Sequence, residues 1–253
     1  MNQASSRPVM RVLHDSGEAL PDAEIGALLA GNEVSGWERK HSSVRSEVYV
    51  GEHHVIKIER SSRQQAVAPW RMRLRAWKMA RRSVRVQRCM GERGVPAPAV
   101  LRVACGPDAL LVVQSRAEGA SVRDLLGRLD AGQRAMMISA LGGAIAMMHN
   151  RALYHGDLNI NNVLATKHDG QWHFTFIDND QNRCLPFPVL SRALANIARM
   201  WAHARAFAIA DEEQAGFLQA YFSALGTRHS PGMLQARLCR RVTRVLGKRG
   251  ARA

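Results

Sequence analysis

A polar loop at residues 154–164 restricts the folds and activities open to this chain. Its sequence is Tyr-His-Gly-Asp-Leu-Asn-Ile-Asn-Asn-Val-Leu, which has the form H-x-D-x-x-x-x-N. In such a loop the aspartate, here Asp157, can accept the proton of an attacking hydroxyl. The asparagine farther along, Asn162, can hold a magnesium ion. The spacing therefore indicates the catalytic loop of a phosphotransferase.

A second aspartate follows at a distance that strengthens this interpretation. Residues 174–177 are a β-branched and aromatic run, Phe-Thr-Phe-Ile, which predicts a strand ending at Asp178. A carboxylate at a strand end can bridge two phosphates through Mg²⁺. An H-x-D tripeptide by itself is common by chance, and its ordinary role is a turn with an aspartate cap. The loop and Asp178 together favour a kinase.

A kinase fold also needs a fixed cation on its N-terminal sheet to contact the ATP phosphates. Lys57 meets this requirement, within the sequence Val-Ile-Lys-Ile at residues 55–58. Residues 46–54 predict a strand and a turn that lead into the lysine strand and form a hairpin. Alone, Lys57 could equally be an exposed strand lysine, but the downstream motif favours the phosphate contact.

The usual glycine-rich phosphate loop is missing. Residues 40–46 carry small hydroxyl side chains in its place, and their backbone N–H groups could cradle phosphate. A solvated hairpin turn is the alternative.

The orientation of Lys57 is a further open point. Residues 69–93 predict a long, arginine-rich helix that packs on the N-terminal sheet, where many kinases place a glutamate beside the lysine. Its only acidic residue is Glu92, just before the Gly-Val-Pro stop at 94–96, and Ser83 stands where the glutamate is expected. Either another carboxylate orients Lys57, with Glu92 nearest in sequence, or the nucleotide site is atypical.

Farther along, the pattern predicts a hinge and a buried helix. Residues 109–114 form a continuous apolar run suited to a buried strand, and residues 115–119 follow as a connector between lobes. The helix expected at 133–150 carries a methionine-rich stripe that indicates core packing.

These features together resemble the bacterial lipopolysaccharide core kinases. The resemblance rests on the lysine strand, the helix exit Gly-Val-Pro-Ala-Pro at 94–98, the loop at 154–164, the Ile-Asp pair at 177–178 and a short C-terminal lobe with Phe-Leu-Gln-Ala-Tyr at 217–221. It covers roughly residues 35 to 225. This group, which contains the Kdo and heptose kinases, has a protein-kinase-like fold.

The resemblance implies an α+β fold with two lobes. The N-lobe would be a small antiparallel β-sheet and the C-lobe mainly helical and shortened. We expect an N-terminal lead-in at 1–34 with a short helix at 22–30, the N-lobe at 35–115, the C-lobe at 116–235 and a basic tail at 236–253.

The resemblance also implies ATP- and Mg²⁺-dependent phosphorylation of a sugar hydroxyl, on Kdo or heptose of the lipopolysaccharide inner core. Asp157 would be the catalytic base, Lys57 would contact the phosphates, and Asn162 and Asp178 would hold Mg²⁺. Asn159 stands where protein kinases often have a lysine, so another cation would be needed there. Asp180 either adds metal affinity or is a solvated turn carboxylate.

Two other functions stay open. Aminoglycoside-type and other small-molecule phosphotransferases carry a similar loop, although their C-terminal lobe is usually larger. The serine at position 83 and the missing glycines would also suit a non-catalytic anion-binding module with a kinase fold.

The charge of the chain points to a polyanionic partner. Its formal net charge is +15, which raises the local concentration of anions. A lipopolysaccharide precursor and an anionic membrane surface are favoured over nucleic acid. Basic residues are concentrated on the helix at 69–93 and in the tail, where apolar residues such as Leu238 and Val242 suit a helix lying on anionic lipid, although a solvated helical face is the alternative for each.

The remaining signals concern location and thiol state. The N-terminus lacks an apolar signal core and no long apolar run occurs, so we expect a cytoplasmic protein, at most peripheral to the inner membrane. The four cysteines form no C-x-x-C pair and are expected as free thiols. The histidines lack metal-ligand spacing and are expected in turns and at the surface. The oligomeric state is not indicated.

Overall fold

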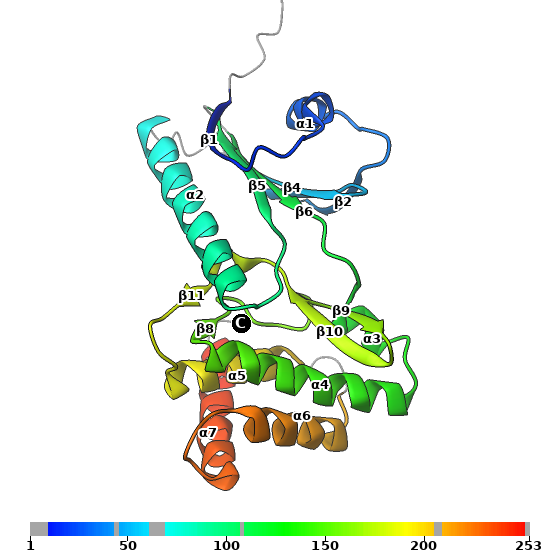
Figure 1. The fold of residues 1–253 in the computed structure, drawn as a ribbon, viewed down its shortest axis with the longest axis vertical. Helices are drawn as coiled ribbons and strands as arrows, with labels where there is room; N and C mark the ends of the chain where they lie inside the picture. Colours follow the sequence, from blue (N-terminus) through cyan, green and yellow to red (C-terminus); the bar gives the residue numbers. More distant parts are fainter. Residues whose placement is uncertain (1–9, 43–45, 61–68, 107–108, 205–208, 251–253) are drawn as a thin grey trace, which may run out of the picture. The chain divides into compact units, whose positions relative to one another are not determined.

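The structure, a computed structural model, describes residues 10–42, 46–60, 69–106, 109–204 and 209–250. The chain forms two compact units. The first comprises residues 1–87 and 98–116, and the second residues 88–97 and 117–253. An antiparallel sheet dominates the first unit and helices dominate the second (Figure 1). This confirms the predicted α+β fold class.

The first unit is built on a six-stranded antiparallel sheet in the order β1-β5-β6-β4-β3-β2. Lys57 lies in β4, opposite Val48 of β3, so the predicted hairpin is present. The elements are β1 (Arg11–Asp15), α1 (Asp22–Leu29), β2 (Glu38–Ser42), β3 (Ser46–Val50), β4 (His54–Arg60), α2 (Pro69–Glu92), β5 (Val100–Cys105) and β6 (Ala109–Ser115).

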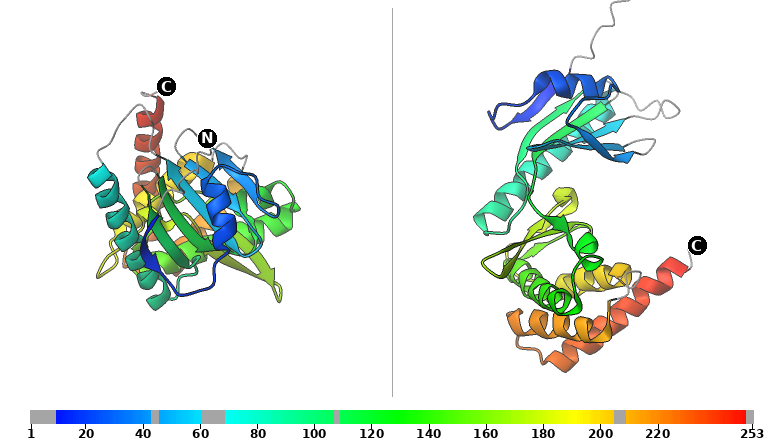
Figure 2. Two further views of the ribbon diagram at one scale, coloured as in Figure 1. Left: turned by 90° about the horizontal axis from the view of Figure 1, so that it is seen from above. Right: turned by 90° about the vertical axis from the view of Figure 1, so that its right-hand side faces the viewer.

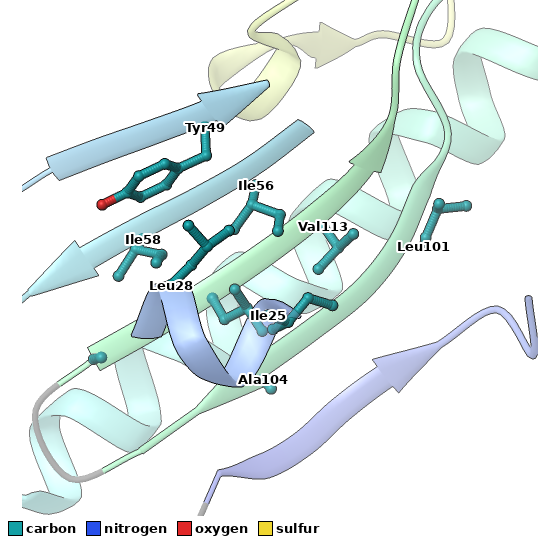
Figure 3. Packing of buried hydrophobic residues seen from close by; sticks show 10 residues of the cluster. Ile25, Leu28, Tyr49, Ile56, Ile58, Leu101, Ala104 and Val113 are labelled. Carbon is teal, nitrogen blue, oxygen red and sulfur yellow. The ribbon is translucent and has the colours of Figure 1, made fainter. Parts of the chain in front are cut away.

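The apolar run of β6 is continuous because helices cover both faces of the sheet. Side chains alternate along a strand, so neighbouring residues of β6 face opposite sides. Leu111 and Val113 belong to the cluster that contains α1 residues, whereas Leu110 and Val112 pack against α2. Figure 3 shows Val113 in the first cluster, next to α1. The helix residues in these two clusters are Ile25 and Leu28 of α1 and Ala76 and Ala80 of α2.

Within the expected lead-in at 1–34, the short helix expected at 22–30 is present as α1, and both β1 and α1 belong to the sheet and its core. β1 pairs with β5 at the edge of the sheet, and α1 belongs to the core on the opposite side from α2. Arg102 of β5 strengthens this edge by bonding Asp15, with 2.8 Å between Nε and Oδ2, and Asp22. Edge pairing uses backbone groups, so the polar side chains of β1 gave no signal of it.

Helix α2 begins and ends where the sequence predicts. Pro69 is its first residue, a position where proline loses no hydrogen bond. Gly94 lies beyond its end at φ +60°, and the Val95 N–H donates to the Met90 carbonyl at 2.9 Å, which closes the last turn. The proposed phosphate loop at 40–46 spans residues 43–45, which lie outside the described residues.

The second unit contains two small sheets and the main helices. The sheet order is β10-β9-β7 in one and β11-β8 in the other. The elements are β7 (Ala120–Ser121), α3 (Val122–Leu126), α4 (Ala131–Asn150), β8 (Leu153–Tyr154), β9 (Val163–His168), β10 (Gln171–Phe176), the 3-10 turn η1 (Asn179–Gln181), β11 (Arg183–Cys184), α5 (Leu190–Ala204), α6 (Asp211–Ala224) and α7 (Pro231–Gly250).

Helices α4 and α6 lie side by side in this unit (Figure 2, right). Asp130 caps α4 by accepting from the Gln133 N–H at 2.8 Å. Arg134 of α4 makes two bonds of 3.0 and 2.9 Å to the nearly buried Glu213 carboxylate of α6. This paired contact fixes one helix against the other.

The methionine-rich face of α4 is only partly core. Met137 and Met148 are fully buried, as predicted. Met136 and Met147, one position before each on the helix, are 55% and 42% exposed, so for them the prediction was wrong. A helix turns by about 100° per residue, so neighbours in a run of methionines cannot all face one core.

The basic tail is part of a longer helix. α7 begins at Pro231 and packs on α5, and it buries Leu234 and Leu238. The prediction that Leu238 faces lipid was therefore wrong, because this side chain belongs to the helical core.

The prediction of four free thiols was also wrong. Cys89, in the last turns of α2, is bonded to Cys184 of β11, 95 residues later. Cys105, which is buried, and the exposed Cys239 are free. No spacing rule links Cys89 to Cys184, since their proximity arises from the fold of the second unit.

The disulfide can be tested by counting thiols. Denatured, unreduced protein should expose two thiols, Cys105 and Cys239, and the full four only after reduction. Replacing Cys89 and Cys184 by serine should lower the free energy of unfolding by about 4 kcal/mol, because the bond closes a long loop. Cys239→Ser is the control and should leave stability unchanged. Four reactive thiols before reduction would contradict the assignment.

Two adjacent glycines of α4 test the close approach of α6. A Cβ at Gly142 would lie 2.5 Å from the Phe217 carbonyl oxygen, whereas one at Gly143 meets nothing within 4 Å. Gly142→Ala should therefore destabilise by about 1–3 kcal/mol through overpacking. Gly143→Ala should stabilise by up to about 1 kcal/mol, because alanine favours the helix. Urea unfolding of both variants measures the difference, and equal effects would rule out the contact.

Candidate active site

The predicted catalytic loop and the strand end at Asp178 lie side by side in the second unit. The loop connects β8 to β9, and β9 pairs with β10 in an antiparallel hairpin. The Ile177 N–H donates to the Asn162 carbonyl at 3.0 Å. This bond places Asp178 next to the end of the loop, so the fold brings Asp157, Asn162 and Asp178 into one region.

The Asp157 side chain is held by two amide groups. Asn162 Nδ2 lies 2.9 Å from the backbone carbonyl oxygen of Asp157 and 3.4 Å from Oδ2 of the Asp157 carboxylate. Asn159 Nδ2 lies 3.1 and 3.3 Å from the same two atoms. The amides therefore restrict the rotation of the Asp157 carboxylate. Because Asn162 uses its nitrogen here, its Oδ1 is the atom left to coordinate a cation.

His155 connects the catalytic loop to the end of the strand that precedes Asp178. The imidazole is fully buried. Nε2 donates to the Ile177 carbonyl at 2.9 Å, and Nδ1 accepts from the Asp157 N–H at 3.2 Å. Burial lowers the pKa of His155, although the Ile177 carbonyl and the charges of Asp178 and Asp157 act in the opposite direction. A neutral ring with its proton on Nε2 satisfies both contacts, so one tautomer is selected.

Asp178 stands in an unusual backbone conformation. Its φ is +59°, in the left-handed region that few residues other than glycine and asparagine or aspartate adopt. The turn after it is held by Asn179, whose Nδ2 donates to the Phe176 carbonyl at 2.7 Å. Asp178 is exposed and the nearby Asp180 is half-buried. The backbone thus turns the first carboxylate out of the strand.

The loop and this turn are locked together by a second set of contacts. Asn182 donates to Asn179 Oδ1 at 2.7 Å and accepts from the Gly156 N–H at 3.0 Å. A Cβ at Gly156 would lie 2.1 Å from the Cβ of Gln181. Only glycine fits between the histidine and aspartate of the motif, because the backbone of the following turn passes so close.

A buried polar chain supports the loop from the helices. Asn196 of α5 donates to the His155 carbonyl at 3.0 Å, and its Oδ1 lies 3.3 Å from Nε2 of His149. Nδ1 of His149 lies 2.8 Å from the Tyr221 hydroxyl of α6. Burial lowers the pKa of His149 to about 4 and raises that of Tyr221. Both groups are therefore neutral, and the prediction that the histidines lie at the surface was wrong for His149 and His155.

The donor atoms suit a magnesium ion held together with phosphates. Among the residues that the structure describes, no group of three or more histidine, cysteine, aspartate or glutamate side chains could hold a metal. Mg²⁺ is often bound by one or two carboxylates and completed by phosphate oxygens and water. The Asp178 carboxylate and Asn162 Oδ1 fit such a site.

Lys57 belongs to the first unit. It lies opposite Val112, whose side chain packs against α2, so Lys57 is on the face of the sheet that α2 covers. Ser83 is buried on α2, on the same helical face as Ala76 and Ala80. The helix therefore carries a serine at the position where many kinases have a glutamate beside the lysine.

Several site residues were missed by reasoning from the sequence. Asn159 was interpreted as the loss of a lysine, but its amide holds Asp157. The roles of Asn182 and Asn196 were also not foreseen. A signal existed for Asn196, since it is a single amide between Ala193, Leu194, Ile197 and Ala198 in an otherwise apolar part of α5. No local pattern reveals the partner of each amide.

A family model agrees with this geometry. The model of the lipopolysaccharide kinase (Kdo/WaaP) family matches residues 70–221, which is more than half of the chain. The chain belongs to this family. The match confirms the resemblance drawn from the sequence, and it spans the catalytic loop, Asp178 and the helices beneath them.

Solved kinases have the same fold. WaaP, solved in complex with acyl carrier protein, matches with a TM-score of 0.56 and 16% identity over 94% of this chain and 98% of its own. The aminoglycoside phosphotransferase APH(3'')-Id from Streptomyces rimosus matches with a TM-score of 0.53 and 16% identity over 88% and 99%. For APH(2'')-IIa, solved with gentamicin, the values are 0.54 and 11% over 87% and 86%.

These matches establish the activity at a general level. The protein is an ATP-dependent kinase with a kinase-like fold. No curated protein matches the sequence. Among the described residues, no helix has the length and apolar character needed to span a bilayer.

The buried His149 makes stability depend on pH. Its pKa is about 4 in the folded protein and 6.5 in the unfolded chain, so below pH 6.5 only the unfolded chain takes up the proton. The stability present above pH 6.5 should fall by about 2 kcal/mol between pH 7 and pH 5. His149→Gln removes this pH-dependent contribution. The unfolding free energy of the unchanged protein should therefore exceed that of the variant by about 2 kcal/mol less at pH 5 than at pH 7. A difference that stays constant with pH would contradict a buried neutral imidazole.

Proposed function

We propose that this kinase transfers the γ-phosphate of Mg²⁺-ATP to a sugar hydroxyl of the lipopolysaccharide inner core, on Kdo or heptose. The family match supports the acceptor class. The observation that carries the reaction is the Asp157 carboxylate, held by the amides of Asn159 and Asn162 beside Asp178. Such fixation suits a group that must meet one hydroxyl in one orientation.

Each residue of the candidate site has one role in the proposed transfer. The acceptor hydroxyl oxygen forms a bond to the γ-phosphorus while the bond to the bridging oxygen of ADP breaks, and the leaving ADP keeps that electron pair. Asp157 accepts the hydroxyl proton. Asn162 Oδ1 and the Asp178 carboxylate would hold Mg²⁺, and the ion would supply positive charge that offsets the charge of the phosphates. Lys57 contacts the phosphates.

His155 and Asn159 act by positioning. The His155 imidazole keeps the backbone of Asp157 and Ile177 at a fixed separation, because it bonds both and is neutral. Asn159 takes the place of a catalytic-loop lysine, and its amide orients Asp157. We infer that charge on the γ-phosphate is balanced by Lys57 and Mg²⁺, with no cation from this position.

The acceptor and the strongly basic chain suit a location at the inner face of the cytoplasmic membrane. A lipopolysaccharide precursor is anionic and lipid-anchored, and the net charge of +15 would draw the protein to such a surface. The protein is therefore proposed to be cytoplasmic and peripheral.

The test is transfer of labelled γ-phosphate from Mg²⁺-ATP to dephosphorylated lipopolysaccharide core. Asp157→Asn should lower turnover at least about a hundredfold and leave nucleotide binding nearly intact, because only the proton acceptor is lost. Asp178→Asn should weaken Mg²⁺-ATP use.

Asp169→Asn is the matched control. Asp169 is an exposed aspartate with φ +49° in the turn between β9 and β10, so it shares the backbone conformation of Asp178 but lies outside the motif. It should behave as the unchanged protein. Full turnover by Asp157→Asn would remove this residue from the mechanism.

The same assay separates the alternative functions. Transfer to an aminoglycoside and not to the core would favour a small-molecule kinase. A protein without transfer whose thermal stability does not rise with Mg²⁺-ATP would be an anion-binding module, since ligand at a hundred times its Kd stabilises by about 2.7 kcal/mol.

A further inference from the structure

Helix α2 has a second apolar face that stays exposed among the described residues of its unit. Ala76 and Ala80 bury one side of the helix against the sheet. The view from above shows α2 beside the strands (Figure 2, left). Trp70, Leu74 and Trp77 are 61%, 43% and 46% exposed. Their spacing of four and three residues places them in one stripe along the helix.

This stripe is accompanied by arginines. The guanidinium of Arg71 lies 5.2 Å from the ring centroid of Trp70, and that of Arg81 lies 4.5 Å from the ring of Trp77. Arg82 and Arg85 are also exposed, and the helix has no acidic residue before Glu92. The face therefore combines two indoles and an aliphatic side chain with a concentrated positive charge.

Exposed apolar stripes of this kind mark interaction sites, because water disfavours large apolar areas. The positive charge requires a negative partner. Indole side chains prefer the headgroup level of a membrane, where the ring is partly apolar and its N–H can reach water. A helix with arginines beside tryptophan and leucine lies in the plane of that interface.

We propose that the face of α2 formed by Trp70, Leu74 and Trp77, with Arg71, Arg81 and Arg82, docks on the surface of an anionic phospholipid bilayer. The two indoles and Leu74 enter the boundary between headgroups and acyl chains. The arginines bind lipid phosphates. This assignment does not rest on the proposed acceptor, because none of these residues belongs to the catalytic region.

One observation favours lipid over nucleic acid as the partner, and a second favours α2 over α7 as the helix that binds it. Leu74, between the two indoles, adds apolar area to a bilayer contact but has no ring on which a nucleic-acid base could stack. The other basic helix, α7, uses Leu234 and Leu238 in its own core and so has fewer apolar groups for insertion. The membrane contact is therefore assigned to α2.

Flotation of the full-length protein with vesicles tests this assignment. The protein should float with vesicles of phosphatidylcholine and phosphatidylglycerol in equal parts, and not with phosphatidylcholine alone. Arg71→Gln, Arg81→Gln and Arg82→Gln combined should weaken binding about a hundredfold, since each charge near an anionic surface contributes about fivefold. Trp70→Gln with Trp77→Gln should weaken it at least tenfold, about the effect of removing two interfacial anchors. The same tryptophan variant should lose quenching of tryptophan fluorescence by brominated lipid.

Two control variants match these changes. Arg237→Gln, Arg240→Gln and Arg244→Gln on α7 remove the same charge from exposed positions, and Phe187→Gln removes another exposed apolar side chain, 64% exposed. Both should bind vesicles as the unchanged protein does. All variants alter exposed side chains, so their thermal unfolding should match and exclude misfolding as a cause.

The proposal is overturned by any of three results. These are absence of flotation with anionic vesicles, loss of flotation in the α7 variant but not in the α2 variants, or α2 variants that lose binding to duplex DNA while flotation is unchanged. Transfer to a soluble acceptor is a separate readout, so a failure of the proposed acceptor would leave this test unaffected.

Discussion

The geometry of the catalytic region depends on one buried hydrogen bond, from Nε2 of His155 to the Ile177 carbonyl. It ties the loop that carries Asp157 to the strand end that carries Asp178. The imidazole can serve both sides because its other nitrogen accepts from the Asp157 N–H and because burial keeps it neutral. A charged ring would donate from both nitrogens and leave the Asp157 N–H facing a donor.

Asparagine side chains make the other hydrogen bonds that fix the catalytic loop. Asparagine is uncharged and both donates and accepts, so it can bridge backbone groups in a buried place without the cost of an unpaired charge. Asn159 and Asn162 hold Asp157, and Asn182 and Asn196 connect the loop to the following turn and to α5. The carboxylates of Asp157 and Asp178 stand in this network of neutral groups, which suits binding of a cation with phosphates.

In the first unit, α2 has two faces with different roles. Small residues on one face, Ala76 and Ala80, allow close packing against β5 and β6. The opposite face keeps tryptophans and arginines exposed, an arrangement that folding alone does not require. Because Glu92 is the first acidic residue of α2, the helix offers no glutamate at the position of Ser83, and the carboxylate that orients Lys57 in many kinases would have to come from elsewhere.

The spacing of Asp157, Asn162, Asp178 and Lys57 was enough to indicate a kinase, because the kinase fold presents these groups in a fixed order along the chain. A continuous apolar run likewise located β6, and strong helix formers before the Gly-Val-Pro stop at 94–96 located α2, since these signals are local in the sequence. The edge pairing of β1, the Cys89–Cys184 bond and the partners of Asn159 and Asn196 were decided only by the tertiary structure. Each joins residues through backbone groups or across distant segments, and such contacts leave no periodic trace in the residues themselves.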